Sequence, residues 1–196
     1  LRPQDGQPVT VPTQDMVLGS YYLTMERFEN GMCHLNQDEG ENWPSNIPFE
    51  LAGKSYFSLS EEERAKINLH SYRNPDEAIM AYSEHDVGLH QPIRVRVTKT
   101  FPADSTLLRR IRELDESRGV RTVECETAAG IEVTRPVITT VGRIIFNNPI
   151  PQDLGYIDRT DPEHCFEYEV GFRVDKGRLG DIIDRAIQKH GFTISA

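Results

Sequence analysis

The alternation of apolar and polar positions predicts a short strand followed by a helix near the start of the chain. Val9 and Val11 flank Thr10, which is the two-residue period of a strand with one buried face. Pro12 should end this strand because it has no N–H to donate to a ladder. A helix capped by Thr13 is expected next. Its apolar stripe, at helical spacing, consists of Val17, Leu18, Tyr21 and Tyr22.

Capping signals predict five further helices. They begin after Ser60, Asn74, Ser105, Thr139 or Thr140, and Asp175. The first has a capping box, because Ser60 is followed three residues later by Glu63, and it should run to about Asn68. The last is the clearest, since apolar residues recur at helical spacing until Gly191, a residue typical of helix ends.

Period-two patterns predict the strands of a small sheet. Ile93, Val95 and Val97 alternate with arginines, which indicates a strand with one buried face. Residues 120–126 and 131–134 read as a hairpin that turns at Ala129-Gly130. A further strand is expected where Phe166, Tyr168 and Val170 alternate with acidic residues. Because short strands and several helices are mixed without a regular βαβ alternation, the predicted fold class is α+β.

Composition narrows the function classes. Asp and Glu number 31 against 22 Lys and Arg, which gives a formal net charge of −9. A free-standing duplex binder normally carries the opposite charge, because its affinity comes from neutralising phosphates. No stretch approaches the roughly 20 apolar residues of a membrane span. Cys33, Cys125 and Cys165 are odd in number and form no CxxC pair, so reduced cysteines and a cytoplasmic location are expected.

No catalytic or metal-binding motif stands out. The six histidines fall on no HxH, HxxxH or HExxH spacing, and Asp153, Asp158 and Asp161 are irregularly spaced in a loop. The chain also lacks a P-loop, a G-x-S-x-G and a G-x-G-x-x-G motif. We therefore expect no metal site and no independent enzymatic activity.

One long stretch carries a family resemblance. Residues 5–24, DGQPVTVPTQDMVLGSYYLT, closely resemble the β′ (largest) subunit family of bacterial DNA-directed RNA polymerase, in the segment after the active-site aspartate loop. Two further stretches agree in the expected order, DVGLHQPIRVRV at 86–97 and ITTVGRIIFN at 138–147. A contiguous match of this length is far more specific than a spaced motif of two or three residues.

The resemblance implies a domain organisation. Residues 1–30 and 74–196 are expected to form the pore-type domain (domain 3) of the largest subunit, beside the active centre and the secondary channel. Residues 31–73 and 101–136 show no family pattern and are expected to be lineage-specific insertions. The chain has no initiator Met and opens on a turn, as a piece of a longer protein would.

The resemblance also implies which residues lie near the chemistry. Gln14 and Asp15 match the family's Gln-Asp pair and are expected nearest the active centre. The alternative is that Asp15 is only a first-turn carboxylate and Gln14 a surface residue. Arg143 matches a Val-Gly-Arg motif, as either a subunit contact or a channel-facing residue.

Catalysis itself is expected to lie outside this chain. The family holds Mg²⁺ on an Asn-Ala-Asp-Phe-Asp-Gly-Asp loop, which is absent here. The isolated chain should bind no cofactor and have no nucleotidyltransferase activity. Its implied partners are the β, α and ω subunits and the rest of β′, with DNA and RNA bound only by the whole bacterial enzyme and no membrane involved.

A second hypothesis follows from charge alone. The net charge of −9 and the acidic loops would also suit an acidic module that docks other proteins without catalysis. In either case, apolar stripes that normally face a partner would be exposed in the isolated chain. Such surfaces promote association, so a marginally stable or self-associating domain is expected.

Overall fold

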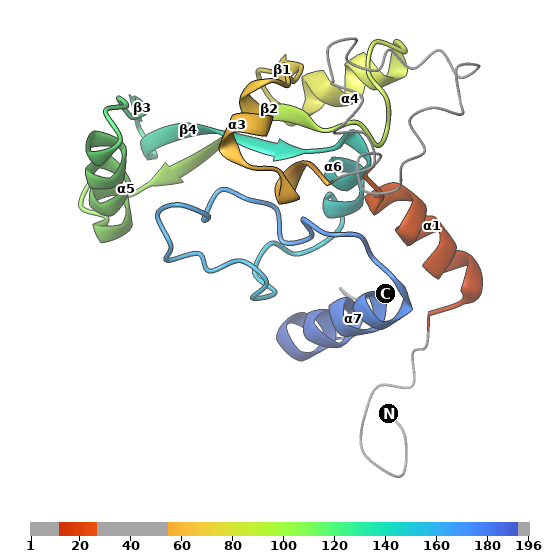
Figure 1. Cartoon of the computed structure of the whole chain (residues 1–196). Helices are drawn as coiled ribbons and strands as arrows, with labels where there is room; N and C mark the ends of the chain where they lie inside the picture. The colour runs from red at the N-terminus through yellow and green to blue at the C-terminus, as the bar shows by residue number, and fades with distance from the viewer. Residues whose placement is uncertain (1–11, 27–54, 192–196) are drawn as a thin grey trace.

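The computed structural model of this chain describes residues 12–26 and 55–191. Within them the chain forms a four-stranded mixed sheet with helices packed around it, which confirms the predicted α+β class (Figure 1). The predicted strand at Val9 and Val11 and the cysteine Cys33 lie outside the described residues.

The elements follow one another without a repeating unit. The helices are α1 (Gln14–Thr24), the 3-10 turn η4 (Tyr56–Ser58), α3 (Glu61–Ala65), α4 (Pro75–Ser83), α5 (Thr106–Ser117), α6 (Val141–Asn147) and α7 (Lys176–His190). The strands are β1 (Ser71–Tyr72), β2 (Ile93–Phe101), β3 (Val123–Thr127) and β4 (Gly130–Thr139).

The sheet is built around a long antiparallel ribbon of β2 and β4. Its order is β1-β2-β4-β3, and β1 runs parallel to β2. The ribbon is in register from the pair Ile93 and Thr139 to the pair Phe101 and Ile131. The predicted hairpin is confirmed, because β3 and β4 pair from Thr127 and Gly130 onward. β1 was not predicted, since two residues are too few to show a period.

Each end of the ribbon has its own apolar core. At one end Ile93 and Val95 pack against α4 and α6 in a cluster with Ala78, Val87, Val141 and Ile144. At the other end Phe101 and Val133 pack against α5 through Leu108 and Ile111. Neighbouring residues of a strand point to opposite faces. Ile138 accordingly meets a separate cluster formed by Tyr56, Leu59, Ile67 and Leu69.

The predicted helix caps are confirmed at every described position. Each capping side chain accepts a hydrogen bond from a backbone N–H of the first turn: Thr13, Ser60, Asn74, Ser105, Thr140 and Asp175. The capping box of Ser60 and Glu63 is complete. α3 nevertheless ends at Ala65, three residues before its predicted end, and the following residues turn so that Ile67 and Leu69 are buried.

The stripe predicted for α1 is present and is only partly covered by the described residues, since Leu18 is 67% exposed and Tyr22 51% exposed. Two other features differ from what the sequence indicates. Glu26, a charged residue shortly after α1, is buried and accepts hydrogen bonds from Tyr56 N–H and the Ser55 hydroxyl. Residues 166–170 form turns and bends instead of a strand, although Phe166 and Val170 are buried.

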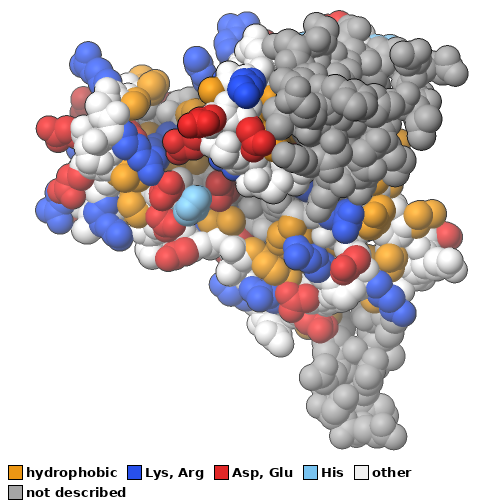
Figure 2. Space-filling view, in the orientation of Figure 1, with side chains coloured by type: hydrophobic (Ala, Val, Ile, Leu, Met, Phe, Trp, Pro, Cys, Tyr) orange, Lys and Arg blue, Asp and Glu red, His pale blue; other side chains and the backbone are white. Residues whose placement is uncertain are grey.

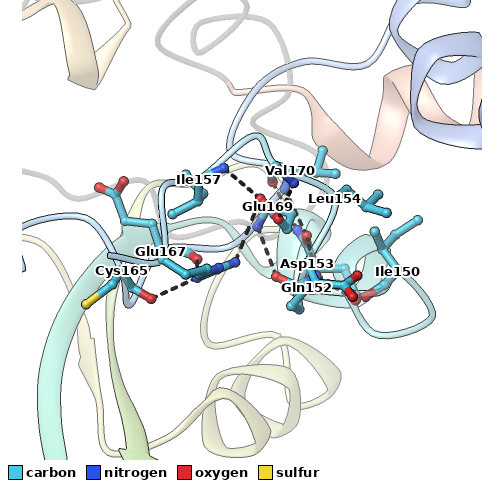
Figure 3. Close-up of polar contacts among 12 residues, drawn as sticks. Ile150, Gln152, Asp153, Leu154, Ile157, Cys165, Glu167, Glu169 and Val170 are labelled. Carbon is cyan, nitrogen blue, oxygen red and sulfur yellow. Dashed lines mark hydrogen bonds and ion pairs between the residues drawn. The ribbon is translucent and has the colours of Figure 1, made fainter. Parts of the chain in front are cut away.

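A buried glutamate organises the segment that replaces this strand. Both carboxylate oxygens of Glu169 accept backbone hydrogen bonds, from Gly155 at 3.0 Å and Ile157 at 2.8 Å (Figure 3). The Arg159 guanidinium lies 3.8 Å from the same carboxylate and donates to the Cys165 and Glu167 carbonyls. The backbone of this segment is therefore satisfied by side chains, and no ladder partner is needed.

The Asn147 side chain joins this segment to α6. Its amide nitrogen donates to the Val170 carbonyl at 3.0 Å, and its oxygen accepts from the Val170 N–H at 3.0 Å. Val170 in turn lies in the apolar cluster that covers α7, with Leu154, Val174, Leu179, Ile182 and Ala186. α7 is thus attached to the sheet through a long irregular segment.

Replacement of Gly142 by Ala tests how closely α6 approaches α1. A Cβ at Gly142 would lie 2.1 Å from the Leu23 carbonyl oxygen, so a backbone would have to move. We expect Gly142→Ala to lower the free energy of unfolding by about 2–3 kcal/mol in urea denaturation. Gly180→Ala is the matched control, because a Cβ there meets nothing and should leave stability unchanged or raise it. Equal effects would contradict the close approach.

Replacement of Glu169 by Gln tests whether the Glu169 carboxylate anchors the irregular segment around it. A Gln side chain has one acceptor oxygen in place of two, so it cannot accept both backbone N–H groups. It also removes the negative charge beside Arg159. We expect Glu169→Gln to cost about 3 kcal/mol in the free energy of unfolding. The control Glu167→Gln alters a half-exposed carboxylate that pairs with His164, and should cost less than about 0.5 kcal/mol. If both variants unfold alike in urea, Glu169 is not the anchor.

Candidate functional site

The three stretches that share the family pattern meet in space at the end of α1. His90, from the second stretch, is buried; its Nε2 lies 2.7 Å from the Tyr22 carbonyl oxygen, and its ring meets the Tyr22 ring edge-on. The Gly142 N–H, from the third stretch, donates to the Leu89 carbonyl at 3.0 Å. We call this meeting of residues 22–24, 89–90 and 140–143 the three-segment junction.

Arg143 is an internal member of this junction. Its side chain is 2% exposed, and its Nε donates to the Thr24 carbonyl at 2.9 Å. The guanidinium also lies over the Phe57 ring, 5.9 Å from its centroid. A carbonyl in the last turn of a helix has no intrahelical partner, and a cation there also suits the helix dipole. Arg143 therefore fixes the C-terminal end of α1 from within the chain.

α7 is tied to the same point. The Thr24 hydroxyl accepts a hydrogen bond from the Val174 N–H at 2.8 Å, just before α7 begins. The same hydroxyl donates to the Ser20 carbonyl at 2.7 Å, so both of its hydrogen-bonding roles are used. The C-terminal end of α1 is thus held by α6, by the segment before β2 and by the segment before α7 (Figure 1).

Gln14 and Asp15 lie at the other end of α1. Both are exposed and belong to the first turn, which Thr13 caps. A helix of eleven residues is roughly 16 Å long, so this pair is well separated from Arg143. The structure therefore does not bring the predicted site residues together. It places Gln14 and Asp15 at the far tip of a helix whose base is the junction.

A cavity of about 580 Å³ lies next to the Glu169 segment. Its lining includes Phe57, Ile138, Tyr156, Tyr168 and Arg178. Burial raises the pKa of the Tyr168 phenol to about 12. Burial, together with a hydrogen bond to Asp181, also raises the pKa of Tyr156. Both phenols are therefore neutral near pH 7, so they can hydrogen-bond a ligand but do not serve as bases.

Two other titratable side chains near this segment have shifted pKa values. The Cys165 thiol is buried, and that burial raises its pKa, so it is protonated near neutral pH. Burial, followed by the nearby charge of Arg159, lowers the pKa of Lys99, whose ammonium donates to the Cys165 carbonyl. Within residues 12–26 and 55–191, no group of three or more His, Cys, Asp or Glu side chains is placed to hold a metal ion.

Sequence reasoning singled out Arg143 but missed His90 of the junction, and it also missed the buried acids Glu26 and Glu169 outside the junction. His90 lies on no motif spacing, and Glu26 and Glu169 look like ordinary surface acids in an acidic chain. The hydrogen-bond partners of Glu26 lie 29 and 30 positions away in the sequence, and that of His90 lies 68 positions away. The one available signal was Gly142, since a glycine at the start of a short helix suggests a close backbone approach.

Comparison with known proteins agrees with the three-stretch pattern. A sequence profile of the family described as RNA polymerase Rpb1, domain 3, matches residues 1–196. In the part of the chain that the structure describes, no helix is long and apolar enough to cross a membrane.

Three curated relatives share one name. DNA-directed RNA polymerase subunit beta' of Thermoanaerobacter pseudethanolicus is 39% identical over 196 residues, and that of Acetivibrio thermocellus is 36% identical over 196 residues; each match covers 100% of this chain. The subunit of Clostridium botulinum is 40% identical over 193 residues, or 98% of this chain. The chain spans only 11 to 12% of the length of these relatives. It therefore belongs to the RNA polymerase Rpb1 domain 3 family.

Proposed function

We propose that this chain is a part of the largest subunit of DNA-directed RNA polymerase and acts in DNA-templated transcription. The observation that carries the proposal is the family match over residues 1–196, together with relatives named as the beta' subunit. The meeting of the three family-like stretches in one junction supports it, because a shared structural role accounts for the pattern in all three.

The proposed role is to position elements of the pore region beside the active centre and the secondary channel. Gln14 and Asp15 lie on a rigid helix, with the junction fixing its opposite end. A catalytic geometry misplaced by about 1 Å can lose a hundredfold in rate, so a rigid support has a direct kinetic value. Asp15 is exposed in the first turn of α1, where its carboxylate is open to a polar contact from outside the described residues.

Metal chemistry in this proposal belongs to the rest of the longer subunit. Mg²⁺ would be held there by carboxylates, and this chain alone would bind no cofactor and catalyse no nucleotidyl transfer. Two buried carboxylates fit this division: Glu169 accepts hydrogen bonds from backbone N–H groups, and Asp115 is engaged by Arg135 and Thr122.

The proposed partners are those of the assembled polymerase. They comprise the remainder of β′ and the β, α and ω subunits, with DNA and RNA bound by the whole enzyme in the bacterial cytoplasm. Arg143 contributes from inside the chain by holding α1, so any contact with a subunit or the channel would be made by the elements it supports. The net charge of −9 also assigns the phosphate-binding surfaces to other parts of the enzyme.

The domain boundaries remain part of the proposal. Residues 1–30 and 74–196 would form the pore domain, and residues 31–73 and 101–136 would be lineage-specific additions. The second of these contains α5, β3 and most of β4, which lie at the end of the ribbon away from the junction (Figure 1). An addition at that end of the ribbon leaves the placement of α1 unchanged.

Substitution of the Gln14 and Asp15 pair tests the proposed position. In the full-length subunit, Gln14→Ala with Asp15→Ala should lower kcat/KM for nucleotide addition about tenfold, or about 1.4 kcal/mol of transition-state stabilisation. The measurement is single-nucleotide extension by reconstituted polymerase. Asp76→Ala, which removes the exposed first-turn carboxylate of α4, is the control and should leave the rate unchanged. Normal extension by the double variant would contradict the assignment.

A further inference from the structure

A groove of about 560 Å³ lies along the uncovered edge of β4, between α3 and the residues that join α5 to β3. β3 pairs with β4 only as far as Thr134, whereas β4 continues to Thr139, and no other described strand pairs with it on that side. Residues 134–138 line the groove. An open strand edge can accept an extended segment of another protein. Because Pro136 has no N–H, the backbone ladder would be short, and side chains must supply most of the affinity.

Exposed apolar side chains gather around this groove. Among its lining residues, Val123 is 65% exposed, Val120 is 59% exposed and Phe57 is 46% exposed. These are three of the seven large apolar side chains that are exposed in the described residues. Figure 2 shows apolar side chains beside Lys and Arg side chains on this part of the surface, at the left of the view. Apolar residues grouped around one concavity mark an interaction site.

Arginines outnumber carboxylates in the groove, although the chain as a whole is acidic. The lining has four arginines and three carboxylates, whereas the net charge of the chain is −9. Arg118 pairs with Glu163 at 2.8 Å. Arg135 pairs with Asp115. Two of the three carboxylates are therefore already neutralised by arginines.

The other two arginines of the lining keep their charge for a partner. Arg64 and Arg121 form no ion pair with a described carboxylate. The Arg64 guanidinium donates to the Tyr56 carbonyl at 3.2 Å and to the Phe57 carbonyl at 2.8 Å, which hold it in place without neutralising it. Arg121 is exposed. Because Glu167 is the one lining carboxylate outside an arginine pair, the groove stays positive and complements an acidic segment.

Hydrogen bonds fix one wall of the groove before any partner binds. The Val120 N–H donates to the Asp115 carbonyl at 2.9 Å, and the Thr122 hydroxyl donates to the Asp115 carboxylate at 2.6 Å. The same carboxylate pairs with Arg135, so residues 120–122 are tied to both α5 and β4. A site that is already formed loses less conformational entropy when it binds.

We propose that this groove docks an extended acidic segment of another protein, in which carboxylates alternate with apolar side chains. The carboxylates pair with the two arginines, the apolar side chains cover the exposed valines, and the backbone lies along the edge of β4. Such alternation is the two-residue period of an extended strand. A nucleic acid fits less well, because it would leave the exposed valines uncovered. The residues that make these contacts are Phe57, Arg64, Val120, Arg121 and Val123.

This docking goes beyond the role proposed for α1 and the junction. The walls of the groove belong to residues 31–73 and 101–136, the stretches proposed above as lineage-specific additions. The test of the docking rests on the proposed function, because it studies the full-length protein within assembled polymerase.

Peptide binding to assembled polymerase tests the groove. A fluorescein-labelled peptide of alternating Glu and Val is titrated with the purified enzyme, and fluorescence anisotropy is measured. We expect saturable binding of this peptide and none of a matched peptide of alternating Lys and Val. Arg121→Glu should raise Kd about tenfold, because it replaces an attraction by a repulsion. The control Arg109→Glu reverses an exposed arginine of α5 outside the groove and should leave Kd unchanged.

A second substitution tests the apolar part of the contact. Val123→Ser should raise Kd for the same peptide about fivefold, because it removes apolar area from the bound interface. Val123 is exposed, so the fold does not depend on its side chain. Met80→Ser is the control, since Met80 is 62% exposed on α4 and lies outside the groove. It should leave Kd unchanged.

Each contrary outcome has a distinct meaning. Equal binding of the Lys and Val peptide, equal Kd for Arg121→Glu and Arg109→Glu, or no saturable binding to assembled polymerase would each overturn the docking proposal. A single-stranded RNA that binds more tightly than the acidic peptide and loses affinity with Arg121→Glu would also overturn it, in favour of a nucleic-acid site. If the protein carrying this chain is absent from purified polymerase, the proposed function itself fails.

Discussion

The close contact of α6 with the end of α1 is the constraint on which the rest of this structure depends. A glycine at position 142 lets the two backbones meet, and the buried Arg143 side chain donates to the Thr24 carbonyl at 2.9 Å. An arginine buried to this extent is costly unless its donors are satisfied, so the contact is both tight and specific. Because Thr24 also receives the Val174 N–H, the same point fixes the approach to α7.

The two ends of α1 have different surroundings. The C-terminal end of α1 is enclosed by the junction, whereas its first turn and its Leu18 face are exposed. An element held at one end and open at the other is suited to present residues to something outside the chain. Under the proposed function, the remainder of a longer subunit would be the partner that these residues contact.

Local features of the fold were predictable from sequence, whereas long-range ones were not. Helix starts at Thr13, Ser60 and Asp175 depend on residues three positions apart, so the capping pattern located them. Burial of Glu169 and exposure of Leu18 depend on partners distant in the sequence or outside it, and no period reveals these. The alternation at 166–170 correctly indicated burial of these side chains. It wrongly indicated strand pairing, because side chains satisfy the backbone hydrogen bonds of that segment. For the candidate site, the resemblance selected α1 and Arg143, but only the structure showed that Arg143 lies inside the chain at the opposite end from Gln14.

The central claim is that this chain works as part of a polymerase largest subunit. The size of the native protein and the proteins that co-purify with it test this claim most directly. Cells of the source organism would be lysed, and the protein captured with an antibody raised against residues 1–24 and probed by immunoblot. The account predicts a band far larger than 22.4 kDa that co-purifies with other polymerase subunits. A free band near 22.4 kDa without those subunits would contradict the claim and favour an acidic interaction module.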